Sequence, residues 1–222
     1  MTISQCIFTL NNKLKKLNAE DIMLLAVTKA QSTESIKEAY TAGIRNFGES
    51  YWQEAQAKIK DLTTLDIIWH FIGHIQSNKI KHLANSFFWI HSIDKYSQAE
   101  LFSKHRSQQL PPLNICIQVN LDSEPQKSGI LPDDLENLVS CILQLPRLKL
   151  RGLMAVPKKA SSKEAQFQSF LRLRVLLESI NQKFSINLDS LSMGMTDDYE
   201  EAIRAGSTII RIGRAIFGER ES

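Results

Sequence analysis

The sequence is poor in cysteine, and its few cysteines have no spacing that suggests a bond or a metal site. The 222 residues include three, Cys6, Cys116 and Cys141, without a Cys-x-x-Cys pair among them. We therefore expect neither a disulfide framework nor a zinc site, and a reducing compartment is favoured. The N-terminus lacks a signal-peptide pattern, and no apolar stretch approaches the length of a membrane span. These absences predict a soluble, cytoplasmic protein without a membrane partner.

An excess of charge of one sign is also missing. The 27 Lys and Arg residues nearly balance the 24 Asp and Glu residues, which leaves a formal net charge of +3. A nucleic-acid-binding module is expected to carry a concentrated basic stripe with aromatic residues interleaved, and none is visible. We therefore expect no nucleic-acid partner. Because no composition boundary, internal repeat or low-complexity tract appears, residues 1–222 are expected to form one domain.

A short apolar run near the N-terminus ends in a lysine that needs an explanation. Residues 22–27 are all apolar and lead through Thr28 into Lys29. Such a run is typical of a strand buried on both faces. Lysine is rarely buried without a partner, so one interpretation is an amine that reaches the surface at the strand end. The other is a partly desolvated amine held for covalent chemistry with a carbonyl.

Strand and helix patterns alternate along the whole chain. After a helix over 3–17, strands are expected over 22–27, 44–47, 67–72, 87–91, 113–120, 148–156, 188–193 and 207–212. Helices are expected between them: from 32 to a stop at Gly43, over 50–60, after Lys79, from Asp94, between Pro132 and Pro146, over 161–182, and over 197–205 with Asp197 as the cap. Eight such units predict a (β/α)8 barrel of the TIM type with an extra N-terminal helix. A doubly wound sheet is the competing architecture, but its glycine fingerprint is absent after the first strand.

Two loops suit a phosphate group. In barrels of this kind the site lies at the carboxyl ends of the strands, and the loops after strands seven and eight often hold a phosphate. Here those loops carry Ser192 with Gly194, and Gly213 with Arg214. Lys29 ends the first strand, which neighbours the eighth once a barrel closes. An aldehyde-reactive amine beside a phosphate cradle points to pyridoxal 5′-phosphate (PLP) as cofactor.

Arg211, in the eighth strand, adds a constraint on the chemistry. If its side chain points into the barrel, it could face the pyridine nitrogen of the cofactor; the alternative is a side chain that points into the helix layer. A guanidinium only donates hydrogen bonds, so it would keep that nitrogen unprotonated. Such a ring is a poor electron sink, which suits racemase-like chemistry or simple carriage better than aminotransfer.

The histidines do not form a pattern that predicts a metal site. Four of the five, His70, His74, His82 and His91, fall within one stretch, but no carboxylate or cysteine joins them at ligand spacing. We expect structural histidines, with His74 at a strand end bordering the pocket, and no metal.

The assembled motifs resemble the pyridoxal phosphate homeostasis protein family, stand-alone relatives of the alanine racemase N-terminal barrel. The similarity covers nearly the whole chain and rests on residues 25–29, 46–51, 69–73, 76–79, 127–129, 151–154, 191–195, 197–198, 206–208, 211–213 and 215–218. It implies a barrel of PLP fold type III, with PLP bound as a Schiff base to Lys29. It further implies a phosphate cup from Ser192, Gly194, Gly213 and Arg214, and Arg211 at the pyridine nitrogen.

Two positions depart from the family pattern. The family commonly has asparagine where this chain has Ser50, a residue that the resemblance places near the cofactor. Serine keeps a hydroxyl at that place but lacks the amide. Arg214 stands where smaller hydroxyl residues are frequent, so the backbone of Gly213 is the firmer phosphate contact expected there.

Two functions remain open at this point. The resemblance implies a PLP carrier that serves intracellular PLP homeostasis, without catalytic turnover, and PLP-dependent apo-enzymes as partners. The alternative is an amino-acid racemase-like enzyme, which needs a second acid or base opposite Lys29. Related racemases take a tyrosine from a further C-terminal domain, whereas this chain ends at Ser222. We therefore expect a non-catalytic protein and a monomer.

Overall fold

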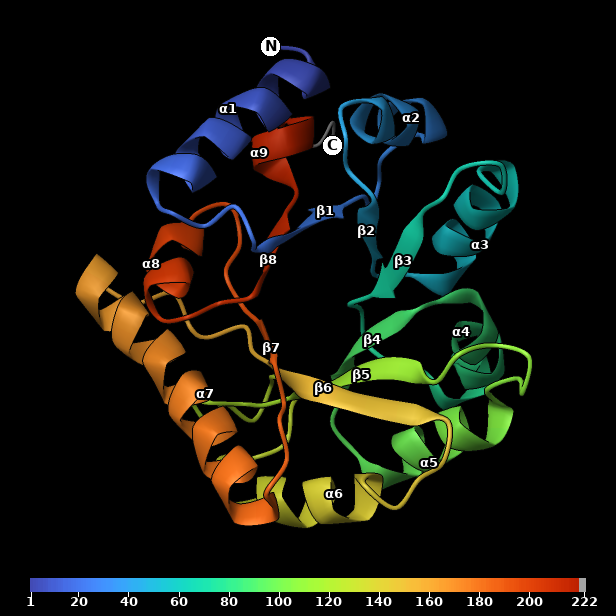
Figure 1. The fold of residues 1–222 in the computed structure, drawn as a ribbon, viewed down its shortest axis with the longest axis vertical. Helices are drawn as coiled ribbons and strands as arrows, with labels where there is room; N and C mark the ends of the chain where they lie inside the picture. The colour runs from blue at the N-terminus through green and yellow to red at the C-terminus, as the bar shows by residue number, and fades with distance from the viewer. Residues whose placement is uncertain (220–222) are drawn as a thin grey trace.

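Eight parallel strands close into a ring in the computed structural model, which describes residues 1–219 (Figure 1). Each strand pairs with the next one in the chain, and β1 pairs with β8 to close the barrel. This confirms the predicted (β/α)8 architecture. The strands are β1 (Met23–Val27), β2 (Asn46–Glu49), β3 (Ile68–Phe71), β4 (Trp89–Ile93), β5 (Leu113–Gln118), β6 (Leu148–Met154), β7 (Ser190–Ser192) and β8 (Ile209–Ile212).

Helices surround the ring, and the extra N-terminal helix is present. It contacts α2 and the short α9, and it lies beside α9 in Figure 1. The helices are α1 (Ile3–Lys16), α2 (Thr33–Thr41), α3 (Trp52–Asp61), α4 (Ile80–Ser86), α5 (Tyr96–His105), α6 (Leu135–Ile142), α7 (Lys163–Phe184), α8 (Tyr199–Arg204) and α9 (Arg214–Phe217), with 3-10 turns at η1 (Ser77–Lys79) and η2 (Pro132–Asp134). Within residues 1–219, none of these helices has the length and apolar character needed to cross a membrane.

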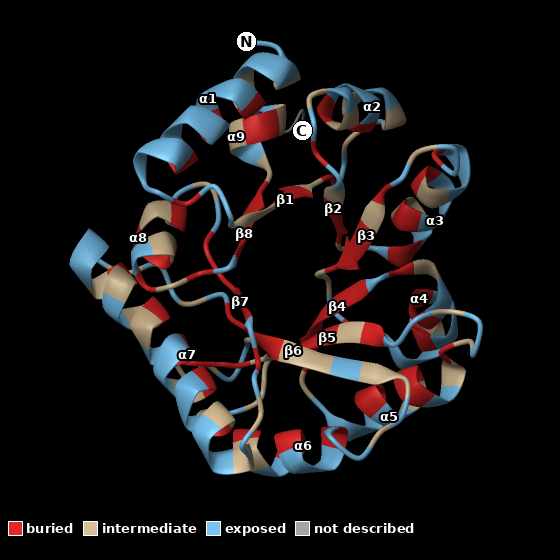
Figure 2. Cartoon of the chain, viewed as in Figure 1, coloured by how far each residue is buried: buried red, intermediate tan, exposed pale blue. Residues whose placement is uncertain are grey.

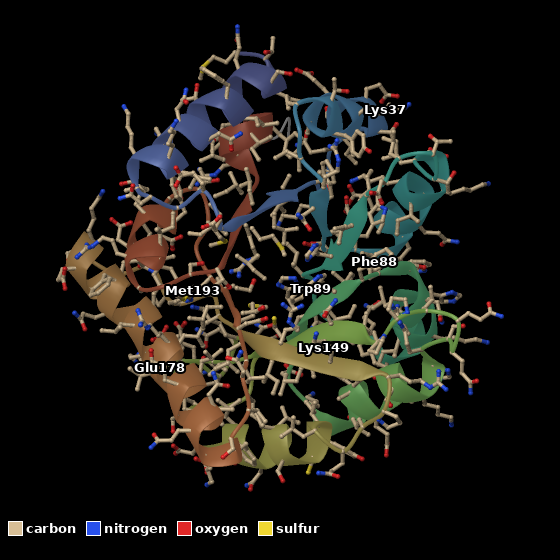
Figure 3. The ribbon with its side chains drawn as sticks, in the orientation of Figure 1. Lys37, Phe88, Trp89, Lys149, Glu178 and Met193 are labelled. Atoms are coloured by element: carbon tan, nitrogen blue, oxygen red, sulfur yellow. The ribbon has the colours of Figure 1, made fainter. Side chains whose placement is uncertain are left out.

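The buried residues form two separate groups. The larger lies between the outside of the barrel wall and the helices, where Figure 2 shows red side by side on strands and on the inner faces of helices. The smaller group fills the barrel lumen and comes from five strands: Leu25, Trp89, Cys116, Met154 and Ile209. Figure 3 labels Trp89 toward the middle of the ring and Lys37 and Glu178 on the surrounding helices. The lumen is thus a packed interior, as expected for an eight-stranded barrel.

Helix ends follow the sequence signals in some places and not in others. Ser32 is the N-cap of α2, and its hydroxyl accepts the Ser35 N–H at 3.2 Å. The same helix ends before Gly43, whose φ of +102° suits glycine. The prediction that Asp197 caps α8 is wrong, because the N-cap is Asp198. Asp197 pairs instead with Arg214, a contact that the local pattern does not reveal.

All eight strands have bounds that differ by one or two residues at an end from those predicted, and two of them show the physical reason. The expected strand over 87–91 starts at Trp89 and runs to Ile93. Phe87 belongs to the turn before it and packs edge-on against Phe71, with ring centroids 5.4 Å apart. The strand expected over 188–193 keeps only three residues. Leu188 lies outside the strand, because its backbone N–H and carbonyl both form hydrogen bonds with the Asn181 side chain.

Candidate cofactor site

The predicted site residues gather at the carboxyl ends of neighbouring strands. Lys29 follows β1 by two residues and is half-buried, and Ser50 directly follows β2. Gly213 directly follows β8, whose Arg211 lies opposite Leu25 of β1. Because β1 pairs with both β2 and β8, the three strand ends are adjacent. The barrel thus brings these loops together as predicted.

The Arg211 side chain points into the lumen and is held by the strands beside it. Its Nη1 donates to the Ser192 carbonyl at 2.5 Å and to the Ser192 hydroxyl at 2.9 Å, and its Nη2 donates to the Ala155 carbonyl at 3.0 Å. Only 5% of the residue is exposed. Burial lowers the pKa of Arg211 to about 10, and the charge of Asp198 opposes that shift. The guanidinium is therefore charged at neutral pH, and the helix-layer alternative is wrong.

Two N–H donors of this guanidinium have no hydrogen-bond acceptor within residues 1–219. Arginine has five N–H donors in a fixed plane. Three serve the bonds to Ser192 and Ala155, and no hydrogen bond within residues 1–219 uses the Nε–H or the second Nη2–H. Arg211 Nε is not one of the buried side-chain atoms that lack a partner, so water or a ligand atom can supply the acceptor. The donor set thus fits a ligand atom that accepts hydrogen bonds, such as an unprotonated ring nitrogen.

A chain of hydrogen bonds continues from Arg211 across the lumen. The Ser192 hydroxyl contacts His91 Nδ1 at 2.8 Å, His91 Nε2 contacts His70 Nδ1 at 3.0 Å, and His70 Nε2 contacts Asn46 Oδ1 at 3.0 Å. Both histidines are fully buried. Burial lowers the pKa of His70 to about 3, and burial together with His70 and Arg211 holds the pKa of His91 well below its usual range. The two imidazoles are therefore neutral.

The structure brings Ser192 to Arg211 and His91. It is the last residue of β7, is fully buried, and uses its hydroxyl in the lumen. A phosphate contact through that hydroxyl stays a prediction.

Backbone N–H groups after β7 and β8 suit an anion. No hydrogen bond in the described part of the chain uses the backbone N–H of Gly194, Gly213 or Arg214. Gly194 has a φ of +92°, and a Cβ there would lie 2.6 Å from the Ala202 methyl carbon, so only glycine fits. Its carbonyl accepts the Arg211 N–H at 3.0 Å, which ties the two loops together. Unpaired N–H groups at strand-to-helix turns match the chemistry of a bound phosphate.

The Arg214 side chain is exposed and occupied by acidic partners. It pairs with Asp197 and, at 3.4 Å, with Glu219. Those carboxylates, Asp197 foremost, raise the pKa of Arg214. At this position the structure supports a role for the backbone more directly than one for the guanidinium.

A buried ionic cluster lies on the other side of the barrel wall, beneath Lys29. Lys58 of α3 is buried, and its amine donates to Glu49 at 2.8 Å and to Glu54 at 2.5 Å. Glu49 is fully buried at the end of β2, and it also accepts the Thr28 hydroxyl at 2.6 Å. Its second carboxylate oxygen has no partner among the described residues. Burial raises the pKa of Glu49, and the bonds from Lys58 and Thr28 oppose that rise.

This cluster fixes the backbone on both sides of Lys29. The Lys58 amine donates to the Thr28 carbonyl at 2.6 Å, and Glu54 accepts the Ala30 N–H at 2.5 Å. Ala30 has a φ of +61°, a left-handed conformation that costs free energy for a residue with a side chain. The two bonds hold the turn in that conformation. We call Lys58, Glu49 and Glu54 the lysine clamp.

Ser50 borders a small cavity next to the barrel mouth. The cavity holds about 160 Å³ and is also lined by Tyr51, His74 and Lys79. A Cβ on Gly73 would lie 1.9 Å from the Ser50 carbonyl oxygen, so glycine lets the loops after β2 and β3 touch. Tyr51, which follows Ser50, is 63% exposed.

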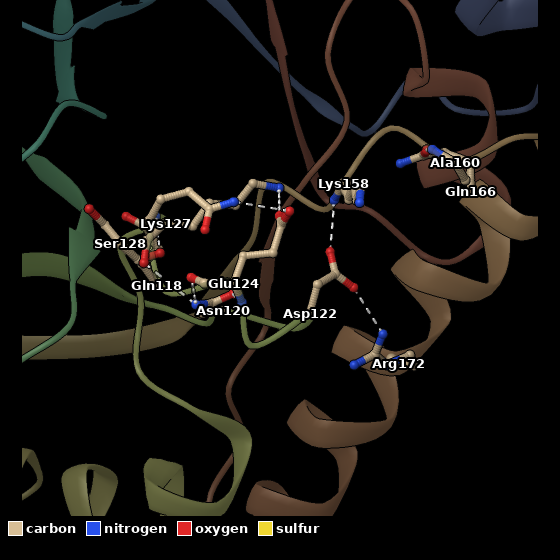
Figure 4. A network of polar contacts seen from close by, with 11 residues as sticks. Gln118, Asn120, Asp122, Glu124, Lys127, Ser128, Lys158, Ala160, Gln166 and Arg172 are labelled. Atoms are coloured by element: carbon tan, nitrogen blue, oxygen red, sulfur yellow. Dashed lines mark hydrogen bonds and ion pairs between the residues drawn. The ribbon is translucent and has the colours of Figure 1, made fainter.

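The loop after β5 is anchored at the same end of the barrel (Figure 4). Asp122 accepts the Lys158 N–H at 2.8 Å and the Arg172 guanidinium at 3.1 Å, which joins the loops after β5 and β6 to α7. Lys127, which could attract an anion, pairs with Glu124 at 2.5 Å.

Sequence reasoning missed the lumen partners of Arg211 and the whole lysine clamp. His70 and His91 were expected to be structural, but not to form a chain to Ser192. A polar residue inside an otherwise apolar strand, as at His70 and Glu49, was the available signal, since such residues are buried only with partners.

A parallel barrel with a lysine after its first strand and anion-suited glycine loops after its last two defines the alanine racemase N-terminal class. The family model described as "Alanine racemase, N-terminal domain" matches residues 10–221. The alanine racemase of Clostridium difficile 630 shares the fold, with a TM-score of 0.78 at 13% identity over 98% of this chain and 57% of that one.

More similar relatives narrow the assignment. The pyridoxal phosphate homeostasis protein of Pseudomonas aeruginosa is 49% identical over 198 residues, covering 89% of this chain and 84% of the relative. That of Escherichia coli K12 is 44% identical over 205 residues, covering 91% and 87%. PipY of Synechococcus elongatus PCC7942, solved with PLP bound, has a TM-score of 0.89 at 33% identity, covering 98% of this chain and all of that one. This chain belongs to the pyridoxal phosphate homeostasis protein family.

Proposed function

We propose that this protein binds PLP through a reversible covalent bond to Lys29 and serves the intracellular supply of that cofactor. The observation that carries the proposal is Arg211: a buried, charged guanidinium, one strand from Lys29, with two N–H donors that no acceptor within residues 1–219 occupies. The relatives' names and the PLP-bound PipY structure support the same ligand.

Each part of the site has a role toward the cofactor. When bound, PLP supplies an aldehyde carbon that a lysine amine can attack reversibly. The unpaired N–H groups of Gly194, Gly213 and Arg214 would hold its phosphate, and Arg211 would donate to its ring nitrogen. Ser50 would lie beside the ring, with a hydroxyl in the place of the amide common in relatives.

We further propose that the protein carries PLP to apo-enzymes as a monomer in the cytoplasm and does not turn over amino acids. Arg211 keeps the ring nitrogen unprotonated, which limits the cofactor's capacity to stabilise a carbanion. The relatives are named as homeostasis proteins, which agrees with carriage. Incubation with L- or D-alanine in deuterated water should give no rapid α-proton exchange. Fast exchange would instead establish racemase-like activity.

The cofactor assignment is tested by absorbance and retention. Purified protein mixed with PLP should keep a visible absorbance band through gel filtration. Lys29→Ala should lose the band, whereas Lys37→Ala, an exposed lysine on α2, should keep it. Retention of an identical band by Lys29→Ala would contradict the proposal.

A further inference from the structure

The hydrogen-bond chain in the lumen has one direction, and Arg211 sets it. Arg211 can only donate, so the Ser192 hydroxyl accepts from Nη1 at 2.9 Å. The hydroxyl must then donate its own proton, and His91 Nδ1, 2.8 Å away, is the acceptor that the structure offers within residues 1–219. His91 Nδ1 therefore carries no proton.

The position of the proton on each imidazole follows in the same way. A neutral imidazole has one N–H, so His91 carries its proton on Nε2 and donates to His70 Nδ1 at 3.0 Å. His70 then carries its proton on Nε2 and donates to the side-chain oxygen of Asn46 at 3.0 Å. Every group is satisfied in this direction. In the reverse direction the Ser192 hydroxyl would accept twice, and its proton would have no acceptor among the described residues.

The surroundings leave the histidines little freedom. His70 stacks on Trp89 with an interplanar angle of 11° and ring centroids 5.6 Å apart. His91 lies 5.7 Å from the same Trp89 ring. Within residues 1–219, neither imidazole has a carboxylate in hydrogen-bond contact. Packing and the chain together therefore permit one rotamer and one tautomer for each ring.

We propose that His91 and Ser192 are positioning residues for Arg211: the one-way chain, which runs from Arg211 to Asn46, fixes the guanidinium so that its two spare donors face the cofactor. The inference rests on the proposed PLP function but concerns groups that the cofactor does not touch. Without the chain, the Ser192 hydroxyl could rotate toward Arg211 or away from it, and the guanidinium would lose one of three anchors. A guanidinium held in one orientation, with two N–H donors directed at the cofactor, favours a pyridine ring whose nitrogen is unprotonated and can accept a hydrogen bond.

The first test needs no cofactor. Nitrogen-15 NMR of ligand-free protein labelled at histidine should show two neutral rings protonated at Nε2, assigned to His70 and His91 by loss of each signal in His70→Gln and His91→Gln. Ser192→Ala should convert the His91 signal to a mixture of tautomers, and Ser192→Thr should restore the single form. A wild-type His91 protonated at Nδ1 would overturn the proposal.

The second test measures PLP affinity in matched variants. His91→Phe breaks the chain and should weaken PLP binding on the order of tenfold, the worth of one hydrogen bond to a charged group. His91→Gln offers an acceptor and a donor and should recover most of that loss. His82→Gln, an exposed histidine outside the site, should match the wild type. Thermal melts must show folded protein in each case, and Ser192→Ala provides a second break in the chain.

The outcomes separate this inference from the proposed function. If the wild type binds PLP, and folded His91→Phe and Ser192→Ala bind it with the same affinity, the positioning role is overturned. The PLP assignment then still holds. If the wild type binds no PLP, the proposed function fails, while the tautomer measurement still decides whether the chain has the stated direction.

Discussion

Arg211 and Lys29 are held in different ways, on the two faces of the barrel wall. Inside the lumen, Arg211 is fixed through its side chain by neutral groups in a single line. Outside the wall, the lysine clamp holds the backbone on either side of Lys29 with one amine shared between two carboxylates.

The difference follows from the role that we propose for each residue toward PLP. To donate a hydrogen bond to the ring nitrogen, the Arg211 guanidinium must point in a fixed direction. Its own hydrogen bonds to Ser192 and Ala155 fix that direction. A lysine that forms and releases a covalent bond needs a backbone held in a fixed position. The bonds to the Thr28 carbonyl and the Ala30 N–H supply that position.

The largest effect is expected from breaking the clamp. Lys58→Met leaves Glu49 buried without its cation and should lower the free energy of unfolding by about 3–5 kcal/mol, measured by urea denaturation. Lys60→Met, an exposed lysine on the same helix, should change it by less than about 0.5 kcal/mol. Glu49→Leu combined with Lys58→Met should recover part of the loss, because no buried charge is left without a partner.

The same variant tests the role of the clamp toward Lys29. Folded Lys58→Met should retain less PLP than the wild type, since the turn around Ala30 loses its anchor. Unchanged retention would show that the clamp stabilises the fold without positioning Lys29.

A smaller, pH-dependent effect is expected from the lumen. The pKa of His70 is about 3 in the folded protein and ordinarily 6.5, so the unfolded chain binds more protons between those values. His70 therefore contributes stability above pH 6.5 that is lost as the pH falls, by up to about 1.4 kcal/mol per pH unit. The lowered pKa of His91 changes the free energy of unfolding with pH in the same direction. The pKa of Glu49 is raised, so Glu49 has the opposite effect: its contribution to the stability of the protein is lost as the pH rises above 4.5.

Urea unfolding between pH 4.5 and 7 measures this dependence. His70→Gln should reduce the slope near pH 5 by about one proton, or about 1.4 kcal/mol per pH unit. His82→Gln, at an exposed ring that stacks on Trp52, is the matched control for loss of a histidine. An equal slope in His70→Gln and the wild type would mean that His70 is not held neutral.

The smallest effect is expected at Arg214. Its side chain is exposed and paired with Asp197, so Arg214→Gln should leave the urea midpoint unchanged within error. It should also keep most of the PLP affinity, because the backbone N–H remains.

Arg211→Gln, in contrast, should weaken PLP binding by roughly 10- to 100-fold. Equal losses in the two variants would show that the Arg214 guanidinium holds the phosphate.

The alternation of apolar runs and helix signals was enough to predict the barrel and the strand ends that meet at its mouth. It did not show which way side chains point, because strands of a parallel barrel are buried on both faces and lack polar alternation. Glu49 and His70 are both polar residues in apolar strands, yet one faces α3 and the other the lumen. The sequence could not distinguish them.

Other errors arose from contacts between distant segments. The local pattern does not distinguish Asp197 from Asp198 as a cap, and it does not reveal that Asp197 pairs with Arg214, 17 residues along the chain. The four residues of α9 are too few to show a helical period. The phosphate contact expected of Ser192 stays a prediction; its hydroxyl accepts a hydrogen bond from Arg211, a contact that the sequence did not reveal.

The most direct test of the account is a peptide map of borohydride-treated protein loaded with PLP. Reduction makes the covalent link permanent, so the labelled lysine can be identified by mass. We predict one label per chain, on the peptide that contains Lys29. A comparable label on Lys58 or on an exposed lysine, or a label of equal yield in Lys29→Ala, would contradict the central claim.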